Sequence, residues 1–493
     1  MNITDLFFKA AAYHPERIAI VEGKRSISYA TLAQEVRATA GYFAKRGIGP
    51  GDRVLVFVPM SIDLYRTVLA LFYRGATAVF LDEWVSRERL ALCCRLADCK
   101  GFIGIWKARL LGYFSKEIRR IPIKLSLRGR GAAQPNATPV DAGQTALITF
   151  TTGSTGTPKA ADRSHGFLAE QFGALIDKIR PEPTDVDLCL LPIVLFVNLG
   201  VGCTSVLAKF NVKKPERLRP GRIVAQLQHE GVTRMTASPY FVERLAEFLE
   251  TESLPLPTLD RIFTGGAPVF PQQAALFRRA FPTSIVHIVY GSTEAEPISS
   301  IRADHLTDTT DGLPVGRVYR KTEVRIVRIS DGALDRVAFK NSILPDGEVG
   351  EICVAGPHVL RRYFKNEEAF EANKITDGNI IWHRTGDSGF LRNGHLFLTG
   401  RCGQIIQHRG RTYFPFLIEQ RLQQIPGIGI GTLLKLEDRL VLVIESTEKR
   451  ATLEPQLSDF KYDELRVLSG IPRDPRHHSK IDYARLRREV ERA

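Results

Sequence analysis

Short apolar runs alternate with amphipathic helical patterns over the first 150 residues of the chain. Ile3–Ala12 and Thr31–Lys45 have the apolar spacing of helices. Arg53–Val58 and Ala76–Leu81 are short apolar runs typical of buried strands. Strands and helices that alternate in this way are typical of a parallel sheet with crossover helices. The sequence therefore predicts an α/β fold at the N-terminus.

The pattern changes twice further along. A loop at Gly131–Gly143 precedes a predicted strand at Ala146–Phe150, and a second α/β stretch follows from Phe167 to about Gly291. Val315–Leu398 is rich in β patterns separated by Asp-Gly turns, as expected for a compact β subdomain. After the glycines at 400 and 403, helical and strand patterns are mixed, and the chain ends in a predicted basic helix. This last part is typical of a small lid domain on a hinge.

The composition fits a globular chain of several domains. Of the 493 residues, 44% are hydrophobic and 25% are charged, which excludes a disordered, collagen-like or coiled-coil chain. We therefore predict an α/β fold with two domains. Residues 1–399 form a large domain of stacked α/β sheets plus the β subdomain, and residues 400–493 form a small, mobile α+β domain.

The charge balance narrows the class of partner. The net charge is +14, which favours acidic partners such as nucleotides, polyphosphates or an anionic membrane surface. Basic residues are densest in Lys116–Arg130, but no aromatic residues are interleaved with them as in a nucleic-acid platform. We predict no nucleic acid partner. The segment is either a solvated face or a peripheral contact with a membrane or another partner.

Hydropathy and cysteine usage favour a cytoplasmic protein with no transmembrane span. Leu188–Ala208 has no charged residue and is long enough to cross a bilayer, but Pro192 and several polar residues would break the helix that lipid requires. We expect a buried strand, a turn and the start of an apolar helix, which could wall an apolar pocket. The seven cysteines form no CxxC pair and predict buried thiols in a reducing compartment. Met1–Phe8 lacks the pattern of a secretion signal.

A loop rich in glycine and hydroxyl side chains follows the strand predicted at Ala146–Phe150. It reads Thr151-Thr152-Gly153-Ser154-Thr155-Gly156-Thr157-Pro158-Lys159. Glycines let the backbone approach an anion, hydroxyls donate hydrogen bonds and Lys159 adds a cation, so the loop suits a polyphosphate. The spacing differs from a Walker A loop, in which a lysine directly follows the second glycine. Taken alone, such a loop is more typical of a surface turn.

Three further segments follow the loop in a fixed order. They are Val289–Glu294, Thr385–Asp387 and Gly400–Arg401. Together with the loop, these residues resemble the core motifs of the adenylate-forming superfamily of acyl-CoA synthetases, peptide-synthetase adenylation domains and luciferases. Matching segments extend over nearly the whole chain. Further features, such as the residues just before Lys480, resemble the long-chain acyl branch that contains the β-lactone synthetases of bacterial olefin biosynthesis.

The resemblance implies a role for each motif residue, although each alone could be a core, turn or helix-end residue. Activation of a carboxylate by ATP needs an acid oxygen to attack the α-phosphorus while pyrophosphate leaves, so the protein must hold three phosphates. The implied contacts are Thr151, Thr152, Gly153, Ser154, Thr155, Gly156 and Lys159 for the β- and γ-phosphates, Thr293 for the α-phosphate, Glu294 for Mg²⁺, Gly265, Gly266, Ala267 and Tyr290 for adenine, Asp387 and Arg401 for ribose, and Lys480 for the carboxylate and α-phosphate oxygens. Gly291 is a further implied nucleotide contact. Lys480, Thr293 and Glu294 are the implied catalytic residues.

Some positions depart from the family pattern. Gly403 stands where the hinge usually carries Asp or Lys, and Gln407 stands where a basic residue is frequent. The family has an aromatic histidine after the phosphate loop. That histidine has no counterpart in Pro192–Phe196, which is apolar throughout. These changes leave adenylation intact as a prediction and leave the second half-reaction open.

The function that the resemblance implies is ATP- and Mg²⁺-dependent adenylation of an apolar carboxylic acid, fatty or β-hydroxy fatty, through acyl-AMP. Fatty acyl-CoA ligation is the first expectation. The alternatives are a β-lactone synthetase, an acyl-AMP ligase that loads a carrier protein, and an inactive nucleotide-binding sensor. CoA is a co-substrate in the first case. Val242 stands where an amino-acid-activating enzyme would place an acidic residue, with Glu243 next to it, which favours a fatty acid.

Overall fold

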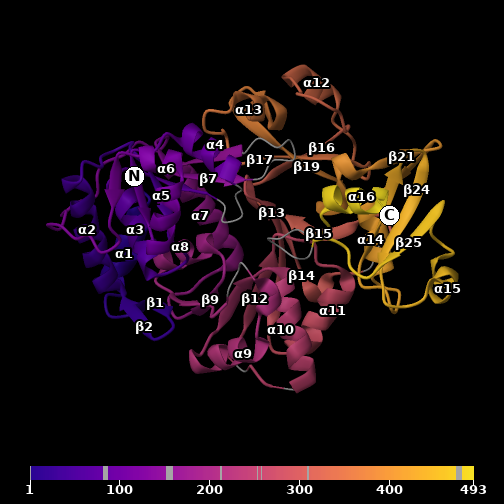
Figure 1. Cartoon of the computed structure of the whole chain (residues 1–493), viewed down its shortest axis with the longest axis horizontal. Coiled ribbons are helices and arrows are strands. Elements are labelled where there is room, and N and C mark those ends of the chain that lie inside the picture. Colours follow the sequence, from indigo (N-terminus) through magenta and orange to yellow (C-terminus); the bar gives the residue numbers. More distant parts are fainter. Residues whose placement is uncertain are drawn as a thin grey trace.

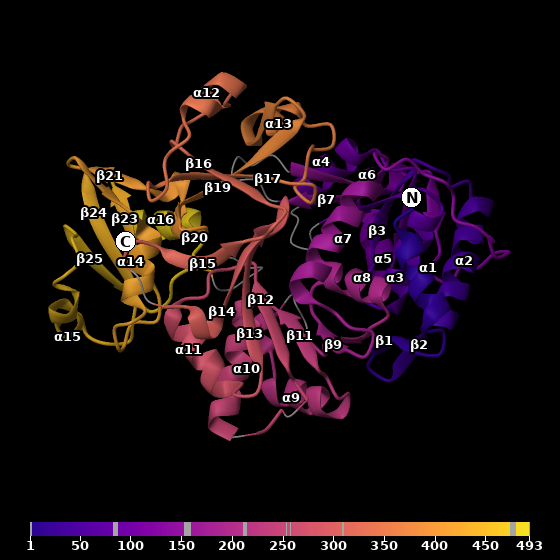
Figure 2. The ribbon, with the colours of Figure 1, turned by 180° about the vertical axis from the view of Figure 1, so that it is seen from behind.

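The computed structural model describes residues 2–81, 87–151, 159–210, 214–252, 254–256, 258–307, 310–473 and 480–492. Three parts follow one another along the long axis of the molecule (Figure 1). An N-terminal α/β part lies at one end, a sheet-rich part lies in the middle, and the part after residue 400 lies at the other end. The view from behind shows the same order (Figure 2).

The first part contains a six-stranded sheet with the order β6-β5-β3-β4-β7-β8. All neighbours in it pair in parallel except β7 and β8, which are antiparallel. Its strands are β3 (Arg53–Phe57), β4 (Thr77–Phe80), β5 (Gly101–Gly104), β6 (Ile123–Leu125), β7 (Thr145–Thr151) and β8 (Lys159–Ser164). The helices of this part are α1 (Thr4–Tyr13), α2 (Tyr29–Lys45), α3 (Ile62–Tyr73), α4 (Arg87–Ala97), α5 (Trp106–Phe114), α6 (Lys116–Arg120) and α7 (His165–Ile179).

Serine caps set where three of these helices begin. The side chains of Ser28, Ser61 and Ser164 accept hydrogen bonds from backbone N–H groups in the first turns of α2, α3 and α7. Such caps satisfy backbone donors that have no partner inside the helix. The predicted helices and strands in this part of the chain are confirmed to within two residues at each end.

The second sheet has fourteen strands and extends from the middle of the molecule to β1 and β2 below the N-terminal part (Figure 1). Its main path is β16-β17-β19-β20-β15-β14-β13-β12-β11-β9-β10-β1-β2, with β18 paired to β19. The strands are β1 (Ile18–Glu22), β2 (Arg25–Ser28), β9 (Val186–Cys189), β10 (Thr204–Leu207), β11 (Arg234–Ala237), β12 (Arg261–Gly265), β13 (Ile285–Ser292), β14 (Ala295–Arg302), β15 (Leu313–Val318), β16 (Glu323–Val327), β17 (Gly350–Ala355), β18 (Lys374–Asp377), β19 (Ile380–Arg392) and β20 (His395–Arg401). Its helices are α8 (Pro192–Val201), α9 (Pro220–His229), α10 (Pro239–Glu252), α11 (Pro271–Ala280), α12 (Arg336–Asn341) and α13 (Glu367–Asn373).

The β-rich segment Val315–Leu398 is continuous with this sheet. β14 pairs with β15 through Ser299–Val318 and Ser300–Arg317, and β15 pairs with β20. The segment is therefore an antiparallel extension of a parallel sheet. The uncharged segment Leu188–Ala208 contains the end of β9, all of α8 and all of β10, which confirms the predicted strand, turn and helix and adds a second strand.

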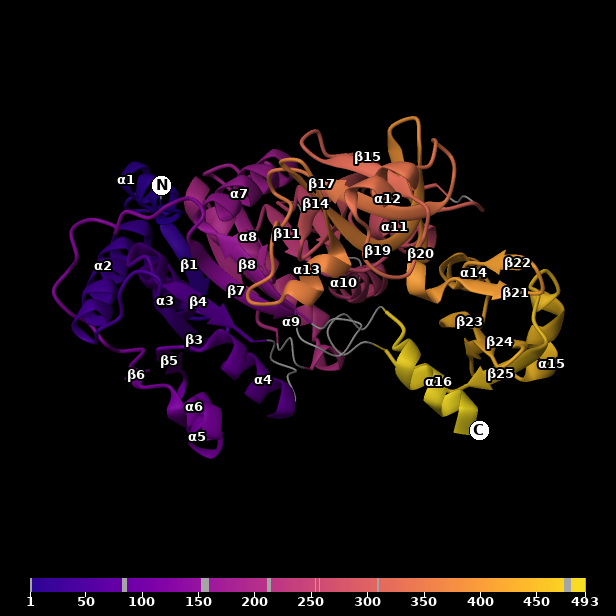
Figure 3. The ribbon, with the colours of Figure 1, turned by 90° about the horizontal axis from the view of Figure 1, so that it is seen from above.

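The part after residue 400 has its own small sheets and cores. It contains β21 (Ile406–His408), β22 (Arg411–Tyr413), α14 (Pro415–Leu422), β23 (Gly431–Leu436), β24 (Arg439–Glu445), α15 (Arg450–Leu453), β25 (Glu464–Leu468) and α16 (Tyr483–Arg492). Figure 3 shows this part beside β20, with α16 at the end of the chain. The boundary at 399/400 stays a prediction, and β20 extends to Arg401.

Two expectations about the whole chain can be compared with the structure. Six of the seven free cysteines are buried, and Cys402 is partly exposed. In the part of the chain that the structure describes, no helix combines the length and the apolar character needed to cross a membrane.

Candidate active site

Two parallel strands bring the predicted adenine wall beside Tyr290. β12 ends at Gly265 and pairs with β13 so that Gly265 lies opposite Val289. The carboxyl ends of parallel strands lie at one edge of a sheet, where α/β proteins bind ligands. A Cβ on Gly265 would lie 2.4 Å from the carbonyl oxygen of Val289, and Gly266 has a φ of +84°. Both positions therefore need glycine, and they place Ala267 at the same edge.

Tyr290 and Arg401 both contact the carboxylate of Asp387. The Tyr290 hydroxyl donates a hydrogen bond of 2.7 Å to Asp387 Oδ2. Arg401 Nε lies 3.0 Å from Asp387 Oδ1, and Asp387 and Arg401 are paired in register on β19 and β20. Burial, followed by the charge of Asp387, raises the pKa of Tyr290 well above its usual range, so its hydroxyl stays a donor. Two predicted nucleotide contacts thus converge on the carboxylate of a third.

Thr293 and Glu294 form the turn between β13 and β14. Tyr363 donates a hydrogen bond of 3.2 Å to Glu294 Oε1, and the backbone N–H of Leu360 donates to the Glu294 carbonyl at 2.7 Å. Arg163 donates to the carbonyl of Thr293 at 3.1 Å. Gly291 precedes this turn, and a Cβ there would lie 2.8 Å from the Ala295 carbonyl oxygen. The turn is therefore fixed from β8 and from the segment before α13.

Lys159 lies at the start of β8, opposite Thr151 in the β7–β8 pair. Its Nζ donates a hydrogen bond of 2.8 Å to Asn373 Oδ1. Burial lowers the pKa of Lys159, and the charge of Glu294 acts against that shift, so the ammonium lies within electrostatic range of the carboxylate. The predicted contacts from Thr152 to Gly156 lie outside the described residues.

A second buried lysine lies beside this pair. Lys374 begins β18, and its Nζ donates to the carbonyl oxygen of Leu360. The Nζ also lies 5.5 Å from the centre of the Tyr363 ring, which suits a cation–π contact. Burial lowers the pKa of Lys374 to about 7, while Glu294 raises it and Lys159 lowers it. Two lysines and one glutamate therefore share one electrostatic environment.

The tail that carries Lys480 comes close to the middle part of the molecule. Arg473 forms an isolated antiparallel bridge with Ile481, so the residues on either side of the segment 474–479 lie together. The charge of Arg473 lowers the pKa of both Tyr240 and Glu243 on α10, although burial raises each of them more. Arg473 thus lies within electrostatic range of α10. The role of Lys480 stays a prediction.

The two hinge departures have different surroundings. Gly403 lies in a short 3₁₀ turn, Cys402–Gln404, and a Cβ on it would meet no atom within 4 Å among the described residues. Packing therefore does not require glycine at this position. The Gln407 side chain accepts a hydrogen bond of 3.0 Å from Thr412 across the β21–β22 hairpin.

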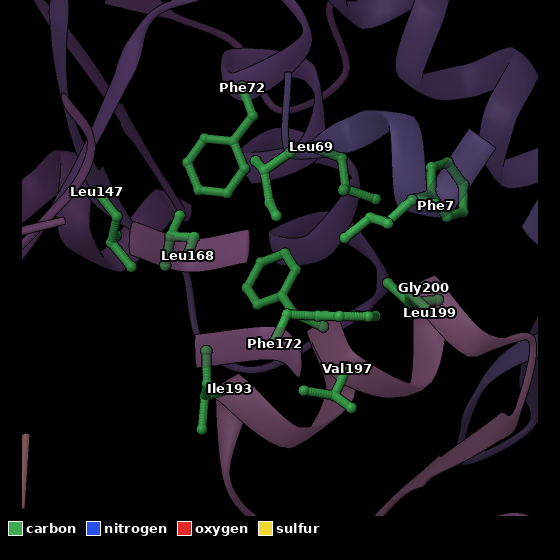
Figure 4. A pocket seen from close by; sticks show the side chains of 13 residues that line it. Phe7, Leu69, Phe72, Leu147, Leu168, Phe172, Ile193, Val197, Leu199 and Gly200 are labelled. Carbon is green, nitrogen blue, oxygen red and sulfur yellow. The ribbon is translucent and has the colours of Figure 1, made fainter. Parts of the chain in front are cut away.

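An apolar cavity of about 50 Å³ lies between α1, α3, α7, α8 and β7. In Figure 4 the side chains of Leu69 and Phe72 on α3 lie across the cavity from Phe172 and Val197. The lining residues are Ile3, Leu6, Phe7, Leu69, Phe72, Leu147, Leu168, Phe172, Ile193, Phe196, Val197, Leu199 and Gly200. Helix α8 supplies five of these, so the uncharged segment does wall an apolar space, as predicted. Val289, next to Tyr290, packs against the same hydrophobic core.

Comparisons with known proteins show the family to which the chain belongs. The family model described as AMP-binding enzyme matches residues 7–364. The chain is 30% identical to the olefin beta-lactone synthetase of Stenotrophomonas maltophilia, over 98% of this chain and 97% of that protein. The corresponding protein of Xanthomonas campestris is 28% identical over 98% of this chain and 96% of its own length. A putative acyl-CoA ligase of Bacillus subtilis is 25% identical over 95% of both chains.

Solved structures share the fold. ATP-bound MatB from Rhodopseudomonas palustris has a TM-score of 0.82 at 22% identity, covering 100% of this chain and 99% of that chain. The amide bond synthetase McbA from Marinactinospora thermotolerans has a TM-score of 0.80 at 23% identity, covering 99% of both chains. The chain therefore shares its mixed α/β architecture with these two proteins.

The fold and the site define an AMP-forming acid ligase. The chain belongs to the AMP-binding enzyme family, within the adenylate-forming superfamily, as the order of its motifs predicts. Enzymes of this family use ATP and Mg²⁺. Among the described residues no group of three or more His, Cys, Asp or Glu side chains could hold a metal ion. A single carboxylate such as Glu294 nevertheless fits Mg²⁺, which proteins commonly bind through one or two carboxylates together with substrate phosphates.

Several residues around the site have no signal in the sequence. Arg163, Tyr363, Asn373 and Lys374 contact Thr293, Glu294, Lys159 and Leu360 from segments far apart in the chain. A tyrosine or an asparagine outside a motif looks like any other core or helix-end residue. Only the fold shows which groups they contact.

Proposed function

We propose that this acid ligase activates an apolar β-hydroxy carboxylic acid with ATP and then closes the acyl adenylate to a β-lactone. The apolar wall that α8 contributes is the observation that carries the substrate class, because apolar side chains stabilise an alkyl chain that leaves water. The two olefin beta-lactone synthetases that align over nearly the whole chain support the second step.

In the first half-reaction an oxygen of the acid attacks the α-phosphorus of ATP and pyrophosphate leaves. We assign Lys159 and the loop before it to the β- and γ-phosphates and Thr293 to the α-phosphate. We assign Asp387 and Arg401 to the ribose and Tyr290 to the face of the adenine. Their contacts with one another hold these side chains in place before the nucleotide binds. Preformed contacts of this kind lower the cost of reaching the transition state.

Glu294 is the residue that we expect to hold Mg²⁺, which would neutralise charge on the phosphates when bound. Its Oε1 already accepts a hydrogen bond from Tyr363, which fixes the direction of the carboxylate. Lys480 is proposed to bring its ammonium to the carboxylate and α-phosphate oxygens, where negative charge grows during the attack.

In the second half-reaction the oxygen of the β-hydroxyl attacks the acyl carbon, the acyl–phosphate bond breaks, AMP leaves and the hydroxyl proton is released. The nucleophile and the acyl group belong to one molecule, so no external thiol is needed and closure gains from proximity. Gly403 at the hinge fits an enzyme that needs no specific polar contact for a separate thiol-transfer conformation.

The surroundings of Glu243 favour an acid without an ammonium group. Val242 is fully buried, and the Glu243 carboxylate accepts a hydrogen bond of 2.9 Å from Gln273 on α11. Burial raises the pKa of Glu243, which makes it a weaker partner for an amino-acid substrate. We also propose a cytoplasmic location, because buried free thiols suit a reducing compartment.

The experiment that tests the proposal is the product mass formed from a β-hydroxy fatty acid with ATP and Mg²⁺, with and without CoA. We expect the loss of one water from the acid, with or without CoA. A thioester that forms only with CoA would contradict lactone closure and favour the CoA ligase alternative, which the Bacillus subtilis relative supports by its name. A carrier-protein thioester would favour the acyl-AMP ligase. Absence of any product or exchange would favour a nucleotide sensor.

A further inference from the structure

Lys159 is held by a residue from a distant part of the chain. Its Nζ donates a hydrogen bond of 2.8 Å to Asn373 Oδ1, and the two residues are 214 positions apart. Asn373 is the last residue of α13. Because the Lys159 side chain is partly buried, the direction of its ammonium depends on the groups that surround it.

The side-chain amide of Asn373 can point only one way. Its Nδ2 donates a hydrogen bond of 2.8 Å to the carbonyl oxygen of Ala369, one turn earlier in α13. An ammonium can only donate and a carbonyl can only accept, so Oδ1 must face Lys159. The backbone oxygen of Asn373 lies 3.3 Å from His383 Nδ1, which fixes this helix end against β19.

The segment before α13 is fastened to β8, which carries Lys159, and to the turn that carries Glu294. The N–H of Phe364 donates to the Ala160 carbonyl at 2.8 Å, and Tyr363 forms an isolated bridge with Ala161. The N–H of Leu360 donates to the Glu294 carbonyl at 2.7 Å. The position of Asn373 is therefore set relative to the same strand, β8, that begins with Lys159.

The chemistry of the contact matters because Lys159 has a competing partner. Glu294 attracts the Lys159 ammonium electrostatically, and Lys374 repels it. If Lys159 formed an ion pair with Glu294, its ammonium could no longer bind the phosphates. It would also occupy the carboxylate that is predicted to bind Mg²⁺. An amide oxygen holds an ammonium without cancelling its charge, whereas a carboxylate would neutralise it and compete with phosphate.

We propose that Asn373 is a positioning residue that keeps the Lys159 ammonium away from Glu294 and directed at the triphosphate of ATP. The inference rests on the proposed function, since it takes Lys159 as a phosphate contact. Asn373 acts only through Lys159, so its effect on ATP binding should vanish when Lys159 is absent.

The test compares Asn373→Ala and Asn373→Asp with the wild-type chain. The dissociation constant of a non-hydrolysable ATP analogue is measured by calorimetry, and the KM for ATP is measured in acid-dependent pyrophosphate exchange. A hydrogen bond to a charged group contributes enough that we expect roughly tenfold weaker ATP binding in Asn373→Ala. The KM for the acid should not change. Asn373→Asp keeps the size of the side chain but loses the hydrogen bond to Ala369, so urea unfolding checks its fold. Its ion pair with Lys159 should weaken ATP binding at least as much.

Two controls separate positioning from general damage. Asn366 caps the other end of α13, where its Oδ1 accepts a hydrogen bond of 2.9 Å from the Ala369 N–H. Asn366→Ala should lower stability and leave ATP binding unchanged. In a Lys159→Ala background, Asn373→Ala should cause no further loss of ATP binding, because the residue on which it acts is gone.

Three results would overturn the inference. They are unchanged ATP binding in both Asn373 variants, an equal loss in Asn366→Ala, or a full further loss in the Lys159→Ala background. The calorimetric measurement needs no acid substrate. The wild-type chain could bind ATP and yet show no pyrophosphate exchange with any acid that is tried. The proposed function would then fail, while the inference about Asn373 could still be tested by calorimetry.

Discussion

Asp387 joins two other predicted nucleotide contacts, Tyr290 and Arg401, through a single carboxylate. Its two oxygens receive the Tyr290 hydroxyl and the Arg401 guanidinium at 2.7 and 3.0 Å. Each carboxylate oxygen has a second lone pair, so the same group can still accept ribose hydroxyls. Because Arg401 is half-exposed, we expect the ion pair to matter for nucleotide binding more than for folding.

We predict that Asp387→Asn weakens ATP binding by roughly tenfold or more, because a charged acceptor for the ribose and for Arg401 is lost. The free energy of unfolding should change by less than about 1 kcal/mol. Calorimetry with ATP and urea unfolding measure the two quantities. Asp311→Asn removes an exposed pair with Arg392 at 2.6 Å and serves as the matched control, with ATP binding unchanged. Unchanged ATP binding in Asp387→Asn would remove this residue from the site.

The sequence alone predicted the motif residues at this scale but not their partners. Tyr290, Asp387 and Arg401 lie in motifs whose order is visible along the chain. Asn373 and Tyr363 lie in no motif, and their contacts with Lys159 and Glu294 depend on how segments far apart in the chain pack. Such contacts arise from the tertiary fold, which local patterns do not determine.

At the scale of elements, helix α8 is fixed by a buried polar network behind the apolar cavity. Arg234 on β11 donates hydrogen bonds to Asp187 Oδ2 at 3.0 and 2.7 Å and to Asn198 Oδ1 at 3.2 Å. Asn198 in turn donates to Asp187 Oδ2 at 3.0 Å. All three residues have an exposed fraction of 0%. The network therefore joins α8 to β9 and β11 and sets the cavity wall.

Arg234→Met is predicted to destabilise the chain by about 3–5 kcal/mol, because it leaves the Asp187 carboxylate buried without its cation. The midpoint of urea unfolding gives this free energy. Arg439→Met is the control, since Arg439 is largely exposed in its pair with Glu464 and should cost less than about 1 kcal/mol. Equal effects of the two substitutions would show that the network does not anchor α8.

A second element-scale contact holds the helix that follows Lys480. Tyr483 on α16 and Thr432 on β23 both donate hydrogen bonds to Glu419 on α14. Burial raises the pKa of Glu419 to about 7, against the smaller lowering effect of the two hydroxyls. The carboxyl group thus keeps its proton in the folded chain at pH values where it loses it in the unfolded chain.

Stability should therefore fall as the pH rises through about 7, because a raised carboxyl pKa stabilises the fold only while the proton is retained. We expect the urea midpoint of the wild-type chain to decrease more between pH 5 and pH 8 than that of Glu419→Gln, which cannot ionise. A Glu419→Gln variant with the same pH dependence as the wild type would contradict this account.

Elements were easier to predict than their pairing. The periodicity of apolar residues is local, so α1, α2, β3, β4 and the uncharged segment containing α8 could be predicted with nearly correct ends. The antiparallel extension of the large sheet depends on the pairing of β14 with β15 and of β15 with β20. Those strands are not distinguished by pattern from the strands of a separate subdomain.

At the scale of the whole molecule, the site lies where the three parts meet. β8 belongs to the first part, β13, β19 and β20 belong to the middle part, and the chain continues from Arg401 into the last part. Phe416 on α14 packs against Phe270, just before α11, with ring centres 5.3 Å apart. A rotation of the last part about residues 402–404 would change this contact and move Lys480 relative to Thr293.

The central claim is that these separate segments bind one ATP and use it to activate an acid. Acid-dependent exchange of labelled pyrophosphate into ATP tests it most directly, because it reports adenylation whatever acceptor follows. We predict exchange with long-chain and β-hydroxy fatty acids, and its loss in Lys480→Ala with ATP binding retained. A folded wild-type chain that exchanges no pyrophosphate with short, long or hydroxylated acids would contradict the account.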